Sequence, residues 1–126
     1  MSSINNFQLS ENFNLQEFEC TGEGHNHVKV CRELVDKLQE LRERLGRPIM
    51  INSAFRCEER NREVGGADES QHLTGRAVDI SMRNQDISHG ELKSLAQGIG
   101  FTGIGLYDTF VHLDTREGQA AVWDGR

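Results

Sequence analysis

A change of hydrophobic period along the chain limits the folds open to it. Between Cys31 and Leu45 apolar residues recur every three or four positions with charges between them, which predicts an amphipathic helix. Gly46 suits a left-handed cap, and Pro48 prevents the helix from continuing. Further along, the period shortens to two, which is typical of strands. With 126 residues there is enough chain for one core, so we expect a single domain over residues 1–126.

Four segments carry the strand pattern. Residues 49–55 and 77–82 predict two strands, and residues 103–107 and 110–115 predict an antiparallel pair that turns at Asp108-Thr109. We therefore expect an α+β fold, a small antiparallel sheet with a few flanking helices.

Two further segments complete the expected fold. A capping-box pattern from Ser88 to Glu91 predicts a second helix, which Gly98 and Gly100 end. Residues 1–30 are polar and predict irregular wrapping over the core. Its expected aromatic anchors are Phe7, Phe13 and Phe18.

Charge and composition exclude some partners. Lys and Arg total 14 against 20 Asp and Glu, a net charge of −6 without a basic run, so we expect no nucleic-acid partner. No stretch approaches the roughly 20 apolar residues that a membrane span needs, and the first residues lack a signal-peptide pattern. We expect a cytoplasmic protein as encoded, released to the cell wall if it comes from a phage. Oligomeric state is unconstrained.

A polar stretch of 21 residues, Arg56 to Arg76, separates the first two predicted strands. Long loops in small domains are usually functional. His72 in this stretch and Asp79 in the next strand have small residues between them, so the chain can present both to one ion. His112, in a later strand, would complete a set of two imidazoles and one carboxylate. Such a set leaves one coordination position open, which is typical of catalytic zinc.

These residues carry a resemblance to a known family. The run Ser70-Gln71-His72-Leu73-Thr74-Gly75-Arg76-Ala77-Val78-Asp79 matches the S-x-H-x-x-G-x-A-x-D signature of the M15 peptidases, the zinc D-Ala-D-Ala carboxypeptidases and endopeptidases. Residues 52–56 (NSAFR) resemble the S-G-Y-R segment before that signature, and residues 110–114 (FVHLD) resemble the strand that supplies the second histidine. An N-terminal Phe-x-Leu-x-Glu-Phe-like stretch and Trp123 extend the similarity to nearly the whole chain.

The resemblance implies a Hedgehog/DD-peptidase-like fold and a zinc peptidase acting on peptidoglycan stem peptides. It implies that His72, Asp79 and His112 bind Zn²⁺. It also implies that Ser70 and Gln71 shape the substrate site and that Arg56 contacts the substrate carbonyl or carboxylate. Zinc polarises a carbonyl and lowers the pKa of bound water toward 7. An arginine can hold the charge that develops on the carbonyl, or bind a terminal carboxylate. Carboxypeptidase and endopeptidase activity both remain open.

The general base is where the chain departs from the family pattern. Some relatives have an acid three residues before the second histidine, where this chain has Thr109 and the acid is Asp108, one earlier. Asp114 shares a strand face with His112 and Phe110. We expect Asp108, at the hairpin tip, to take the proton from zinc-bound water. We expect Asp114 to accept a hydrogen bond from the ring nitrogen of His112 that does not bind zinc. The reverse assignment stays open.

Two other functions fit the same residues. Two histidines and a carboxylate also suit Fe(II) in a non-haem oxygenase, where His112 and Asp114 would supply two of the ligands. No histidine follows Asp114 to complete the usual order. A zinc-stabilised binding module would keep the ion without turnover.

A second group of metal-binding residue types lies near the N-terminus: Cys20, His25, His27 and Cys31. Its spacing matches no common zinc finger, and Cys31 already has a place on the apolar side of the predicted helix, so a second metal site is the less favoured interpretation. With three cysteines and no secretion signal, we expect reduced thiols. Cys57 would pair with Cys20 in an oxidising compartment.

Overall fold

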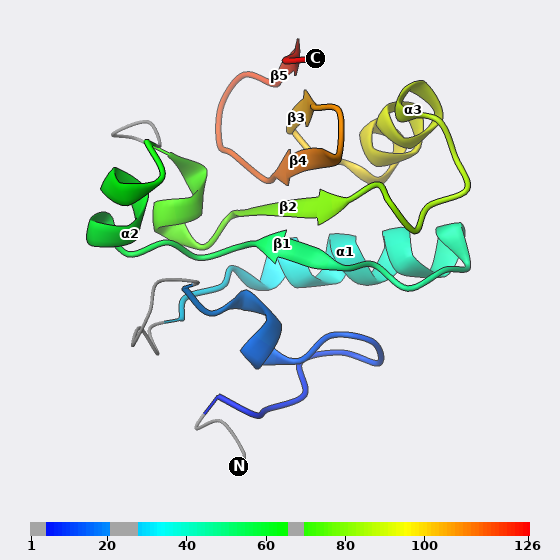
Figure 1. The fold of residues 1–126 in the computed structure, drawn as a ribbon. Coiled ribbons are helices and arrows are strands. Elements are labelled where there is room, and N and C mark those ends of the chain that lie inside the picture. Colours follow the sequence, from blue (N-terminus) through cyan, green and yellow to red (C-terminus); the bar gives the residue numbers. More distant parts are fainter. Residues whose placement is uncertain (1–4, 21–27, 66–69) are drawn as a thin grey trace.

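The computed structural model describes residues 5–20, 28–65 and 70–126. The fold is built around a five-stranded sheet (Figure 1). In spatial order the strands are β1 (Ile51–Ser53), β2 (Ala77–Ser81), β4 (Phe110–Asp114), β3 (Gly103–Leu106) and β5 (Ala121–Asp124). The pairs β1–β2, β2–β4 and β4–β3 are antiparallel, whereas β3 and β5 run parallel. The expected α+β class is confirmed, but the sheet is mixed because β5 adds a parallel edge strand.

The helices in the described residues are η1 (Leu15–Phe18) and η2 (Gln71–Thr74), both 3-10 helices, and α1 (Arg32–Leu45), α2 (Glu58–Glu63) and α3 (His89–Ile99). The helix α1 ends where expected, because Gly46 adopts a left-handed φ of 65°. The Ser88 hydroxyl caps α3 by accepting from the Glu91 backbone N–H at 3.1 Å. Gly98 lies inside α3 and Gly100 caps it, since a helix tolerates one interior glycine at modest cost. In these segments no helix has the length and apolarity to cross a membrane.

One face of the sheet carries the core. The buried strand residues are Val78 and Ile80 of β2, Ile104 and Leu106 of β3, and Val111 and Leu113 of β4. They form one cluster with Leu34, Val35, Leu38 and Leu41 of α1 and Leu92 and Ala96 of α3. Because side chains alternate along a strand, the residues between them face the opposite side of the sheet. Asp79 and His112 therefore lie on the face away from these helices.

The polar stretch from Arg56 to Arg76 contains more regular structure than the expected loop, since α2 and η2 both lie within it. Ser70 caps η2 by accepting from the His72 N–H at 3.2 Å, and Gly75 ends η2 with a left-handed φ of 72°. A side chain at Gly75 would put a Cβ 2.5 Å from the carbonyl oxygen of Lys29. Glycine therefore allows the chain to reverse between η2 and β2 against the segment that precedes α1.

The N-terminal segment packs through two of its three expected anchors. Phe13 and Phe18 are buried in the core, and their rings lie 6.2 Å apart between centroids. The prediction for Phe7 is wrong, because this residue is 66% exposed. Its backbone carbonyl accepts from the Leu15 N–H at 2.8 Å, so Phe7 holds the segment through its main chain. The expected irregular stretch at residues 21–27 lies outside the described residues.

This difference predicts unequal effects of two matched substitutions. Phe18→Ala should lower the free energy of unfolding by about 3–5 kcal/mol, because it leaves a cavity in the core. Phe7→Ala should change it by no more than about 0.5 kcal/mol, as for most exposed sites. Urea denaturation of both variants measures the difference. Equal losses would show that Phe7 packs in solution.

Candidate metal centre

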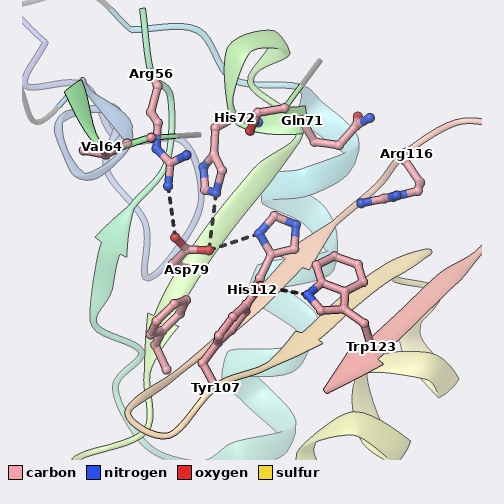
Figure 2. Close-up of a pocket in the computed structure, with 12 residues that line it drawn as sticks. Arg56, Val64, Gln71, His72, Asp79, Tyr107, His112, Arg116 and Trp123 are labelled. Carbon is pink, nitrogen blue, oxygen red and sulfur yellow. Dashed lines mark hydrogen bonds and ion pairs between the residues drawn. The ribbon is translucent and has the colours of Figure 1, made fainter. Parts of the chain in front are cut away.

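Three buried side chains from separate elements converge on the open face of the sheet (Figure 2). His72 comes from η2, Asp79 from β2 and His112 from β4. Asp79 and His112 are directly paired across the two strands. One potential ligand atom from each residue lies within 4.8 Å of the others. The structure thus brings together the three side chains that the sequence singled out as metal ligands.

In each histidine one ring nitrogen, here called inner, faces Asp79, and the other, called outer, points away from it. The outer nitrogen has an acceptor, which sets the tautomer of the neutral ring. His72 Nδ1 lies 2.6 Å from the carbonyl oxygen of Ala54, so Nδ1 donates and Nε2 keeps a lone pair. His112 Nε2 lies 2.7 Å from Asp114 Oδ2, so Nε2 donates and Nδ1 keeps the lone pair. Those two inner nitrogens lie 3.3 and 3.0 Å from Asp79 Oδ1.

With both imidazoles neutral, three lone pairs face one another, and this arrangement is stable only with positive charge between them. Burial by itself would raise the pKa of Asp79, but the two rings, when protonated, donate hydrogen bonds to it, first from His112 and then from His72, and with their charge hold this pKa well below its usual value. Burial would likewise lower the pKa of His112, but its hydrogen bonds to Asp114 and Asp79 raise it. A proton can supply the charge, and so can a metal ion. Two imidazoles and a carboxylate form a donor set that fits zinc.

The Asp114 carboxylate is fully buried behind His112. Arg116 donates to it from Nε at 2.9 Å, from Nη2 at 2.7 Å and from the backbone N–H at 3.1 Å. Burial would raise the pKa of Asp114, but these bonds and the one from His112 hold it far below its usual value. A side chain at Gly103, opposite on β3, would overlap the Asp114 carboxylate. The chain thus keeps an anion fixed against the outer nitrogen of His112.

Arg56 follows β1 and reaches the same cluster. Its Nη2 lies 3.4 Å from Asp79 Oδ2, while Nε and Nη1 lie 3.4 Å from Ser53 Oγ and Asn61 Oδ1. The two oxygens of Asp79 thus have different partners, since Oδ1 faces the histidines and Oδ2 faces the guanidinium. Arg56 is thus held beside the three candidate metal ligands and lines a pocket that opens over them.

A pocket of about 620 Å³ opens over the cluster. The sequence-predicted residues that line it are Arg56, Ser70, Gln71, His72, Asp79 and His112. Asp108 is exposed on the β3–β4 turn and is not among the described lining residues, of which Asp79 is the only carboxylate. The role of Asp108 as general base stays a prediction.

Sequence reasoning gave no site role to several other wall residues: Val64, Gly65, Tyr107, Phe110, Arg116 and Trp123. The period of two placed Phe110 beside His112, and that signal was sufficient to find it. Trp123 lies on β5, which pairs parallel to β3, so nothing in its local sequence revealed its neighbours.

The geometry separates the other metal-binding interpretations. Asp114 bonds the outer nitrogen of His112, so the two do not face one ion as the iron-oxygenase alternative required.

Of the second candidate cluster, His25 and His27 lie outside the described residues, and Cys31 is the N-cap residue of α1. The sulfur atoms of Cys20 and Cys57 lie 3.5 Å apart as thiols. Within the described segments, His72, Asp79 and His112 are the one group of three or more such side chains close enough to share an ion.

We predict that the purified protein holds about one zinc ion per chain, and that His72→Ala, Asp79→Ala or His112→Ala each removes it, since two remaining protein ligands hold zinc weakly. Elemental analysis after dialysis measures the occupancy. His89→Ala is the matched control, because His89 donates to the carbonyl oxygen of Tyr107 and lies outside the cluster. Full occupancy in His112→Ala would mean that the third ligand is another residue.

Comparisons with known proteins agree with this geometry. A family model described as Peptidase M15 matches residues 5–114. A curated relative, the zinc D-Ala-D-Ala carboxypeptidase of Streptomyces albus G, is 39% identical over 69 residues. Those residues are 54% of this chain and 26% of the relative, so the similarity covers a minor part of that protein.

Proposed function

Because this chain belongs to the peptidase M15 family, we propose that it is a zinc peptidase that hydrolyses peptide bonds in peptidoglycan stem peptides, as a D-Ala-D-Ala carboxypeptidase or an endopeptidase. The observation that carries the proposal is the convergence of His72 Nε2, Asp79 Oδ1 and His112 Nδ1 beneath an open pocket. Three protein ligands leave a position for water or substrate, as in catalytic zinc sites. The name of the Streptomyces albus G relative supports the substrate class.

The chain's own residues have separable tasks in this proposal. His72, Asp79 and His112 would hold zinc, which when bound polarises the scissile carbonyl and lowers the pKa of a bound water. The guanidinium of Arg56, beside Asp79, binds the carbonyl oxygen on which charge develops or the terminal carboxylate of the substrate. Ser70 and Gln71 shape the adjoining wall, where Ser70 caps the turn that carries His72.

We propose Asp108 as the general base. Asp114 is unsuited to that task, because its oxygens already accept from His112 and Arg116 and are shielded from solvent. Asp108 lies between Tyr107 and Phe110, both of which line the pocket, so an inward turn of the β3–β4 connection would present its carboxylate to a bound water.

A second function, a zinc-stabilised binding module, is supported by one observation. Among the described residues that line the pocket, Asp79 is the only carboxylate, and it is a proposed metal ligand. A site without a base would bind stem peptides and leave them intact.

Digestion of purified peptidoglycan, followed by mass analysis of the products, tests the proposal and separates these functions. Release of free D-Ala indicates a carboxypeptidase, and release of cross-link fragments indicates an endopeptidase. Either product should disappear when zinc is removed with a chelator and return when zinc is restored. Zinc-loaded protein that binds peptidoglycan without releasing products would support the binding module and overturn the peptidase.

The two aspartates predict different defects. Asp108→Asn should lower kcat about 10²–10⁴-fold and leave zinc bound, because it removes a proton acceptor. Asp114→Asn should weaken zinc affinity about 10–100-fold, because His112 loses the anion on its outer nitrogen. Zinc titration and peptide hydrolysis measure both effects, with the exposed Asp86→Asn as a control. Normal cleavage by Asp108→Asn would place the base elsewhere. Lost turnover with unchanged zinc affinity in Asp114→Asn would reverse the two roles.

Arg56→Lys should keep zinc and lower kcat/KM by about 10²-fold, since lysine retains the charge but lacks the planar donor fork. Steady-state hydrolysis of a stem peptide measures the loss. Arg62→Lys provides the matched control, because Arg62 is exposed on α2 outside the pocket. An unchanged kcat/KM in Arg56→Lys would remove Arg56 from the substrate site.

A further inference from the structure

The wall of the pocket formed by Tyr107, Phe110 and Trp123 carries a polar group that the proposed mechanism does not use. Tyr107 directly follows β3, and its N–H donates to the Phe110 carbonyl at 3.0 Å. Its own carbonyl accepts from His89 Nε2 at 2.7 Å. The backbone that carries the phenol ring is thus bonded both to β4 and to the start of α3.

The ring of Tyr107 is fixed as well. It stacks on the Phe110 ring with centroids 4.6 Å apart and planes 8° from parallel. A side chain at Gly125 would bring a Cβ within 2.5 Å of the Tyr107 ring. The chain therefore has a glycine where the phenol needs space, and the ring has little freedom to turn away from the pocket.

The direction of the Tyr107 hydroxyl proton follows from its partner. Trp123 Nε1 lies 2.8 Å from the Tyr107 hydroxyl oxygen (Figure 2). An indole N–H can only donate, so the hydroxyl accepts this bond and its own proton points elsewhere. Among residues 5–20, 28–65 and 70–126, no group accepts a hydrogen bond from this hydroxyl. The hydroxyl is thus a donor available to the pocket.

Trp123 is itself held close to the metal ligands. Its ring lies 5.3 Å from that of His112 between centroids, and the Arg116 guanidinium carbon lies 5.3 Å from its ring centroid. A side chain at Gly105, which pairs with His112 across β3 and β4, would place a Cβ 2.5 Å from the indole. The group that orients the Tyr107 hydroxyl is therefore packed against the proposed metal centre.

We infer that Tyr107 is a substrate-binding residue whose hydroxyl donates a hydrogen bond to an oxygen of the bound peptide, with Trp123 as its positioning residue. The inference rests on the proposed function, since peptides present carbonyl and carboxylate oxygens as acceptors. Arg56 and Tyr107 then contact the substrate from different parts of the pocket wall (Figure 2). The aromatic faces beside the hydroxyl suit small apolar side chains such as the methyl group of alanine.

The test uses the zinc-loaded protein, residues 1–126, and a phosphinate isostere of a D-Ala-D-Ala stem peptide, which is not hydrolysed. Trp123 is the one tryptophan of the sequence, so its fluorescence reports binding directly. Tyr107→Phe should raise the Kd for the isostere about tenfold and leave zinc affinity unchanged, because it removes the hydrogen bond to the peptide, together with the one accepted from Trp123, and keeps the ring. Trp123→Phe, followed by calorimetry, should raise the Kd by a smaller factor. Val122→Ala, an exposed neighbour on β5, should have no effect.

The outcomes assign the acceptor or overturn the inference. An effect of Tyr107→Phe that disappears with a C-terminally amidated isostere identifies the terminal carboxylate, and an effect that persists identifies a peptide carbonyl. Equal Kd values for wild type and Tyr107→Phe would overturn the role of Tyr107, with the proposed function intact. A wild-type protein that neither binds the isostere nor cleaves peptidoglycan would overturn the proposed function, and this inference with it.

Discussion

The pairing of β2 with β4 is the contact on which the site depends. It places Asp79 directly opposite His112, and it places Val78 opposite Leu113 on the other face of the sheet. A shift of one residue in this register would turn every side chain of a strand to the opposite face. Burial of the apolar residues against α1 and α3 therefore sets the register, and the register sets the distance between two proposed metal ligands. The same β2–β4 register therefore determines both the packing of the core and the geometry of the site.

The neighbouring strand β3 completes this arrangement by leaving space. Its sequence alternates Gly103 and Gly105 with Ile104 and Leu106, and the two apolar residues belong to the core. The glycines pair with Asp114 and His112, and side chains there would overlap the Asp114 carboxylate and the Trp123 indole. The strand β3 thus alternates like an amphipathic strand, but on the face away from the core it has glycines where such a strand usually has polar side chains. That space admits the buried carboxylate behind His112 and the indole beside it.

The sequence predicted what local patterns determine. The apolar period placed α1, and the period of two placed His112 and Asp114 on one face. It missed β5, because a short edge strand that pairs parallel with β3 depends on contacts far along the chain. For the same reason the wall containing Trp123 was not found. Phe7 was misassigned because composition cannot distinguish an aromatic residue held by its backbone from one held by its ring. Asp108 is a turn residue by type, and the sequence could not show how far its carboxylate lies from the pocket.

Crystallography of the zinc-loaded protein, with anomalous scattering recorded at the zinc edge, tests the central claim most directly. The convergence of His72 Nε2, Asp79 Oδ1 and His112 Nδ1 predicts one strong peak about 2.0–2.2 Å from all three atoms. His112 Nε2 should remain bonded to Asp114. A peak at another group of residues, or zinc bound through the outer nitrogen of His112 with Asp114 displaced, would contradict the account.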